Sequence, residues 1–162
     1  GDRIEHASVA PDWAVEEMAR LGLTVVSQPN FIAERGDEYR GTVEPDALPY
    51  LYRLQAFQTA GVVLAGGSDA PFGDPDPWAA MRAAVTRQTR TGHVMGGDEA
   101  LSPEDALGLF LADPVHLSVQ RGIEVGSVAD LCLLDRPWAS ARGRLLAQDV
   151  RAVFIDGIED AR

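Results

Sequence analysis

The sequence predicts an α/β fold in which residues 1–121 build strands and helices around a parallel sheet and residues 122–162 form a second region of short strands. Three observations indicate this organisation. Short β-rich runs alternate with helical patterns through residue 91. Residues 62–65 form a continuous apolar run, which is typical of a strand that a parallel sheet buries on both faces. Beyond residue 121 the pattern changes to short strands and turns.

The first predicted elements are a strand that ends near His6 and a helix that begins at Pro11. Gly22 is the expected stop of this helix, and a second strand covers residues 23–27. Residues 30–44 are polar and contain glycine, so we expect a long loop there. The core face of the first helix is predicted to carry Trp13, Val15, Met18 and Ala19.

Three further helices are predicted after this loop. The first covers residues 46–60 and precedes the apolar strand at 62–65. Asp76 and Pro77 have the residue types of an N-cap and a first helical position, which predicts the start of the next helix. Ser102 is the expected N-cap of the last one.

Two short strands complete the predicted elements, over residues 129–134 and 150–155. Cys132 lies in an apolar run within the first of them, so we expect a buried structural thiol. A single cysteine forms no internal disulfide, and the sequence shows no signal-peptide pattern. We therefore expect a cytoplasmic protein.

Composition excludes several classes of protein. The chain has 162 residues, whereas a complete eight-fold α/β barrel needs roughly 250. The formal net charge is −11, and an acidic surface repels phosphate backbones and anionic membranes, so we expect neither nucleic acid nor membrane as a partner. All 14 cationic side chains are arginines. Without lysine, the chain cannot supply P-loop, Schiff-base or carbamylated-lysine chemistry.

Two chemistry-bearing side chains follow predicted strand ends. His6 closes the first strand, and Asp69 lies just beyond the strand at 62–65. Ligands bind outside the carboxyl ends of parallel strands, where imidazole and carboxylate groups can both ligate a divalent metal. The residues by themselves leave structural roles open, with His6 as a hydrogen-bonded strand end and Asp69 as the cap of a turn.

An ordered set of motifs resembles the amidohydrolase superfamily of metal-dependent hydrolases, in particular the branch of N-substituted formamide deformylases. The motifs are RIEHA (3–7), VSQP (26–29), GSDAP (67–71), AVTR (84–87), LSPEDAL (101–107) and VGSVADL (125–131). The resemblance implies the C-terminal part of a metal-dependent hydrolase barrel of the TIM type. Strands six to eight with their helices would occupy residues 1–121, and C-terminal strands of a small β-sandwich would occupy residues 122–162.

The resemblance also implies roles for individual residues. His6 corresponds to the metal ligand at the end of strand six, and Asp69 to the residue after strand eight that both ligates the metal and shuttles the proton. The residues after strand seven would lie near the substrate; they are Gln28, Pro29, Asn30 and Phe31. The expected cofactor is a divalent metal, with zinc as the expected ion.

Other family ligands have no counterpart in this sequence, namely the H-x-H motif after strand one, the bridging acidic or carbamylated-lysine ligand and the strand-five histidine. The resemblance therefore implies a fragment of an enzyme that hydrolyses a small amide-type C–N bond, inactive alone. Two alternatives stay open: a non-catalytic interaction or regulatory module, and a small α/β domain that binds an anion at Gly66 and Gly67. Open sheet edges also predict a homo-oligomer, or pairing with a missing N-terminal portion.

Overall fold

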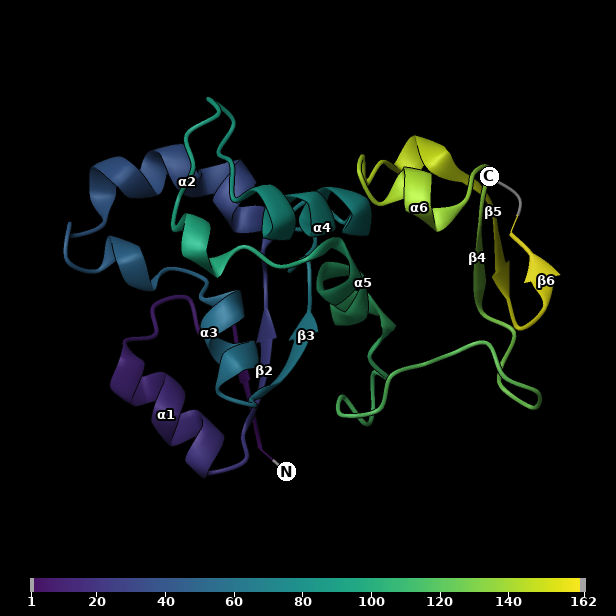
Figure 1. Cartoon of the computed structure of the whole chain (residues 1–162), viewed down its shortest axis with the longest axis horizontal. Helices are drawn as coiled ribbons and strands as arrows, with labels where there is room; N and C mark the ends of the chain where they lie inside the picture. Colours follow the sequence, from purple (N-terminus) through teal and green to yellow (C-terminus); the bar gives the residue numbers. More distant parts are fainter. Residues whose placement is uncertain (1, 161–162) are drawn as a thin grey trace.

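The described part of the chain forms two three-stranded sheets with helices packed around and between them (Figure 1). The computed structural model describes residues 2–160. The first sheet is parallel, in the order β1-β2-β3, and the second is antiparallel, in the order β4-β5-β6. This arrangement confirms the predicted α/β class. The strands of the first sheet are β1 (Arg3–Glu5), β2 (Thr24–Ser27) and β3 (Val63–Gly66).

The central strand β2 anchors the first sheet. Val25 pairs with Ile4 of β1 on one side and with Leu64 of β3 on the other. Its side chain is fully buried and shares a core cluster with residues of the two helices that follow β1 and precede β3. These are α1 (Asp12–Arg20) and α3 (Leu54–Thr59), which contribute Val15 and Phe57 to the cluster.

One residue of the predicted core face of α1 lies elsewhere. Trp13 is 71% exposed, whereas Val15 is buried and Met18 and Ala19 pack against the same cluster. Trp13 stands two residues before Val15, which is about 200° around a helix, and therefore points away from the sheet.

The two predicted N-caps are confirmed. The side chain of Asp76 accepts a hydrogen bond from the backbone N–H of Trp78 (2.9 Å) at the start of α4 (Pro77–Thr86). The hydroxyl of Ser102 accepts from the N–H of Asp105 (3.1 Å) at the start of α5 (Pro103–Leu111). Both helices lie between the two sheets (Figure 1).

The predicted loop at 30–44 is a helix, α2 (Asn30–Thr42). Phe31 and Ile32 are buried at its start, so packing rather than local propensity stabilises this helix. Gly36 is required in its middle, because a Cβ there would lie 2.6 Å from Cγ2 of Thr89. The polar outer face and this glycine hide the helical pattern in the sequence.

The helix predicted over 46–60 is interrupted. The structure has a 3-10 turn, η1 (Leu48–Tyr50), then a break and α3. The buried Arg87 guanidinium donates hydrogen bonds to the carbonyls of Leu51 and Tyr52 at 2.9 and 2.7 Å. These carbonyls therefore accept from a side chain and not from the backbone N–H groups of a continuous helix. Tyr52 also has a φ of +48°, which a continuous right-handed helix does not allow.

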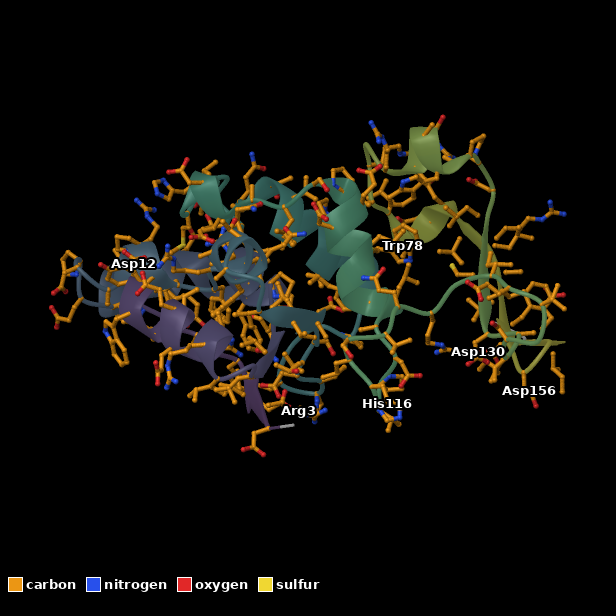
Figure 2. All side chains as sticks on the ribbon, turned by 60° about the horizontal axis from the view of Figure 1, so that its bottom comes forward. Arg3, Asp12, Trp78, His116, Asp130 and Asp156 are labelled. Atoms are coloured by element: carbon orange, nitrogen blue, oxygen red, sulfur yellow. The ribbon has the colours of Figure 1, made fainter. Side chains whose placement is uncertain are left out.

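The second sheet contains β4 (Leu131–Leu134), β5 (Val150–Ile155) and β6 (Ile158–Glu159). Val150 joins the core cluster that Trp78 of α4 forms with residues of α5. The C-terminal segment therefore packs on α4 and α5. Figure 2 shows Trp78 at this junction, and it shows Asp130 and Asp156 together at the far end of the sheet, where Asp156 N–H donates to Asp130 (2.9 Å).

Cys132 is exposed, so the prediction of a buried thiol is wrong. The apolar run around it forms β4, which among residues 2–160 pairs with β5 alone and is an edge strand there. Residues 131–133 are exposed on both faces of the strand. The boundary predicted at residue 121, the barrel numbering of the strands and a sandwich around the second sheet all stay predictions.

Candidate functional site

The predicted site residues gather at the carboxyl edge of the first sheet. His6 follows β1 directly, and its N–H donates to the carbonyl of Val26 (2.7 Å). On the other side of β2, the N–H of Gly67 donates to the carbonyl of Ser27 (2.9 Å). These bonds extend the strand pairing beyond the strands and keep the three strand ends in line.

The chain turns sharply at the two candidate metal ligands. His6 has a φ of +67° and Asp69 a φ of +57°, a region in which non-glycine residues are uncommon and often functional. The carbonyl of Asp69 accepts the N–H groups of Phe72 (2.9 Å) and Gly73 (3.2 Å). Asp69 therefore begins a tight turn immediately beyond β3.

Phe31 connects the two strand ends. Its ring stacks with the His6 imidazole at a centroid distance of 6.5 Å and an interplanar angle of 7°. Its edge contacts the ring of Phe72, in the turn that begins at Asp69, at 5.6 Å. Phe31 is buried and Phe72 is 62% exposed, so the aromatic contacts run from the interior to the surface beside the site.

Gln28 and Asn30 are buried amides with fixed orientations. Gln28 Nε2 donates to the carbonyl of Val26 (3.3 Å), and Asn30 Nδ2 donates to Glu34 Oε1 (2.9 Å) and to the carbonyl of Ser68 (3.2 Å). A carbonyl or an ionised carboxylate can only accept, so the amide nitrogens must face these partners. Gln28 Oε1 and Asn30 Oδ1 consequently face the other way. Within residues 2–160, neither of these buried oxygens has a hydrogen-bond donor.

Pro29, the remaining predicted substrate contact, is fully buried and sets the start of α2. Its φ of −62° and ψ of −27° are already helical, and its carbonyl accepts the N–H of Ile32 (3.2 Å). The proline offers no donor of its own. Its observed contribution is to aim Asn30 and Phe31 at the strand ends.

Sequence reasoning missed two residues on the next turn of α2. Glu34 Oε1 accepts the N–H of Asp74 (3.1 Å) in addition to the amide of Asn30. The Arg35 guanidinium lies 3.9 Å from the centroid of the Phe72 ring and donates to the Phe72 carbonyl (3.4 Å). Both residues fall in the segment predicted as a loop. A prediction of the helix would have been needed to place their side chains near the site.

The residues of the alternative anion site, Gly66 and Gly67, are used in packing. A Cβ on Gly66 would lie 2.9 Å from Cζ of Phe110 and 3.1 Å from Cβ of Leu109. The N–H of Gly67 is bound to Ser27. Anion sites of this type need several N–H groups aimed at the ligand, so this geometry does not support the alternative.

The side chains at the strand ends are of the types that bind a divalent metal, but they are too few to complete a catalytic site. An imidazole from His6 and a carboxylate from Asp69 are both zinc-ligand types, and a catalytic zinc takes three protein ligands. Among residues 2–160, no group of three histidine, cysteine, aspartate or glutamate side chains is placed to hold an ion. This part of the chain therefore does not complete a metal centre.

Comparison with known proteins gives the family. Residues 1–158 match the Amidohydrolase family, and the chain belongs to it. An N-substituted formamide deformylase from Arthrobacter pascens is 33% identical over 165 residues, which cover 96% of this chain and 30% of that protein. The predicted resemblance is confirmed. The chain spans about 30% of the length of the curated relatives it matches.

Solved structures of similar proteins agree with this assignment. An uncharacterized metal-dependent hydrolase from Pyrococcus horikoshii OT3 is 31% identical, with a TM-score of 0.59 over 67% of this chain and 22% of that one. An N-isopropylammelide isopropylaminohydrolase from Burkholderia multivorans is 24% identical, and the match covers 99% of this chain and 39% of that one with a TM-score of 0.59. The latter shows a shared fold. Within residues 2–160, no helix has the length and apolar character that crossing a membrane requires.

Proposed function

We propose that this chain is part of a metal-dependent amidohydrolase that hydrolyses a small, non-peptide amide-type C–N bond. One observation carries the proposal: in a chain of the amidohydrolase family, His6 and Asp69 follow the outer strands of one parallel sheet, on either side of β2. The deformylase relative favours N-substituted formamides as the first substrates to test.

His6 and Asp69 would hold a divalent ion, for which zinc is the expected identity. Further ligands would come from polypeptide equivalent to the rest of the relatives' length, because two side chains do not complete a catalytic zinc site. A divalent ion at such a site polarises a carbonyl and lowers the pKa of bound water. We accordingly expect residues 1–162 alone to show no turnover.

Asp69 is the proposed acid–base group. Its carboxylate takes a proton from the water whose oxygen bonds to the amide carbon, and it delivers that proton to the leaving nitrogen as the C–N bond breaks, which releases an amine and a carboxylic acid. Gln28 and Asn30 are buried at the same edge of the sheet, and within residues 2–160 their side-chain oxygens have no hydrogen-bond donor; a substrate amide could bind them only after the side chains become accessible. The Phe31 ring would bound the site on its apolar side.

The test measures amine release from a panel of N-substituted formamides, with added zinc, by the longest natural polypeptide that contains these residues. Asp69→Asn keeps the size of the side chain and removes the base, so we expect kcat to fall by about 10²- to 10⁴-fold. Asp46→Asn, at an exposed turn after α2, is the matched control and should leave kcat unchanged. Full activity of Asp69→Asn would refute the proposed role.

A further inference from the structure

We infer that Glu34 is a positioning residue for Asp69. Its carboxylate connects both ends of the segment 68–74, which carries Asp69, to the first turns of α2. The significance for catalysis rests on the proposed function, in which Asp69 moves a proton. The inference about position rests only on the contacts of Glu34 and can be tested without any turnover.

A single carboxylate oxygen joins the two ends of the segment. Glu34 Oε1 accepts the N–H of Asp74 at 3.1 Å, which fixes the end after Asp69. The same oxygen accepts Nδ2 of Asn30 at 2.9 Å, and this Nδ2 also donates to the carbonyl of Ser68 at 3.2 Å, which fixes the end before Asp69. Asn30 is 2% exposed, so its bonds lie away from competing water.

The backbone of the segment between these ends is tightly packed. Phe72 and Gly73 donate their N–H groups to the carbonyl of Asp69. A Cβ on Gly73 would lie 2.2 Å from the carbonyl oxygen of Ser68 and 2.6 Å from Nδ2 of Asn30. Because the backbone closes on itself this tightly, a displacement at Asp74 is transmitted to Asp69.

Arg35 contacts the same segment from outside and cannot replace Glu34. Its guanidinium stacks on Phe72, whose side chain is 62% exposed, and its bond to the Phe72 carbonyl is 3.4 Å long. Glu34 bonds to the N–H of Asp74 and, through Asn30, to the carbonyl of Ser68, so it acts on both ends of the segment, whereas within the segment Arg35 contacts Phe72 alone. The fixed ends of the segment therefore depend on Glu34.

The test is amide hydrogen exchange, followed by NMR residue by residue, in the full chain. Glu34→Ala should speed exchange of the Asp74 N–H and of the Phe72 and Gly73 N–H groups, each by about five- to tenfold, the effect of losing one hydrogen bond. Glu34→Gln retains an acceptor oxygen and should stay within about twofold of the wild-type rates. Glu38→Ala, one turn further along α2 and exposed, should change none of them.

The three amides separate positioning from a merely local bond. Acceleration at Asp74 alone would overturn the inference, since the turn that begins at Asp69 would then hold without Glu34. Equal acceleration in Glu34→Gln would also overturn it. If Glu34→Ala does not fold, Glu34→Asp shortens the side chain by one methylene and should give the same pattern.

In an active enzyme, Glu34→Ala should lower kcat with little change in KM and Glu34→Gln should restore it. A wild-type enzyme with no hydrolase activity refutes the proposed function and leaves the exchange result to decide the position of Asp69.

Discussion

Asn30 and Ser68, which are 38 residues apart, are joined by a hydrogen bond of 3.2 Å from Nδ2 of the asparagine to the serine carbonyl. Asn30 begins α2, and Ser68 immediately precedes Asp69. The bond therefore fixes the first turn of a helix against the segment that carries the proposed proton shuttle. Its burial makes it sensitive to substitution, because water cannot replace a lost partner.

We expect Asn30→Asp to destabilise the fold by about 1–3 kcal/mol at neutral pH. The substitution removes the donor to Ser68 and places a second carboxylate against Glu34, where Nδ2 now lies 2.9 Å from Oε1. Urea denaturation followed by circular dichroism measures the loss. Gln55→Glu makes the same amide-to-carboxylate change at an α3 side chain bonded to Thr59 at the surface and should cost far less. Equal stability of Asn30→Asp and wild type would contradict this account.

Gly73→Ala should lower the free energy of unfolding by about 1–3 kcal/mol. A Cβ at this position meets the Ser68 carbonyl at 2.2 Å, so the segment or the start of α2 must shift. Gly41→Ala is the matched control, because Gly41 lies near the end of α2 with open space where the Cβ would be. That change should stabilise the protein by up to about 1 kcal/mol, the helix-propensity difference. The two denaturation midpoints should thus move in opposite directions.

Local signals account for the parts of the fold that the sequence predicts well. The cap residues Asp76 and Ser102 bond to backbone groups within three residues, so their pattern is complete in a short window. The helix α2 has no such signal, because its stability comes from buried Phe31 and from the close approach of Thr89 to Gly36. Tertiary contacts decide that segment, and a local pattern cannot contain them.

The same distinction applies to the site. The placement of His6 and Asp69 was predictable, because a residue that follows a parallel strand lies at the carboxyl edge of the sheet; their roles stay predictions. Glu34 was not, because its role depends on bonds to Asn30 and to Asp74, which is 40 residues distant. The exposure of Cys132 likewise depends on which strands pair, since β4 has one neighbouring strand in the part of the chain that the structure describes.

Asp37 should make stability depend on acidic pH. The hydroxyls of Thr91 and Thr89 donate to its Oδ1 at 2.6 and 2.7 Å, and these hydrogen bonds lower the pKa of the carboxyl. A carboxyl with a lowered pKa in the folded state stabilises that state above its unfolded pKa of about 4, and the contribution is lost as pH falls through the folded pKa.

The measurement compares urea midpoints of wild type and Asp37→Asn from neutral pH to about pH 2. Asp37→Asn should be less stable than wild type at neutral pH and should lose less stability on acidification. Asp46→Asn, at an exposed turn, should follow the wild-type curve. Parallel curves for wild type and Asp37→Asn would show that the bonds to Thr89 and Thr91 do not favour the charged carboxylate.

Open sheet edges and exposed apolar side chains favour self-association. In the part of the chain that the structure describes, β1 and β3 are the edge strands of the parallel sheet, and each leaves a row of backbone N–H and C=O groups without a strand partner. The second sheet adds exposed apolar side chains; these include Leu133, Ile155 and Ile158 at 46%, 59% and 74% exposure. A three-stranded sheet is near the lower limit of independent stability, and pairing edges between copies would bury both the edges and the apolar faces. We therefore expect a dimer or larger species at micromolar concentration.

Sedimentation equilibrium over a concentration series should give a mass above 17.4 kDa that rises with concentration. A monomer of that mass at every concentration, melting in a single cooperative transition, would show that these strands are stable with open edges.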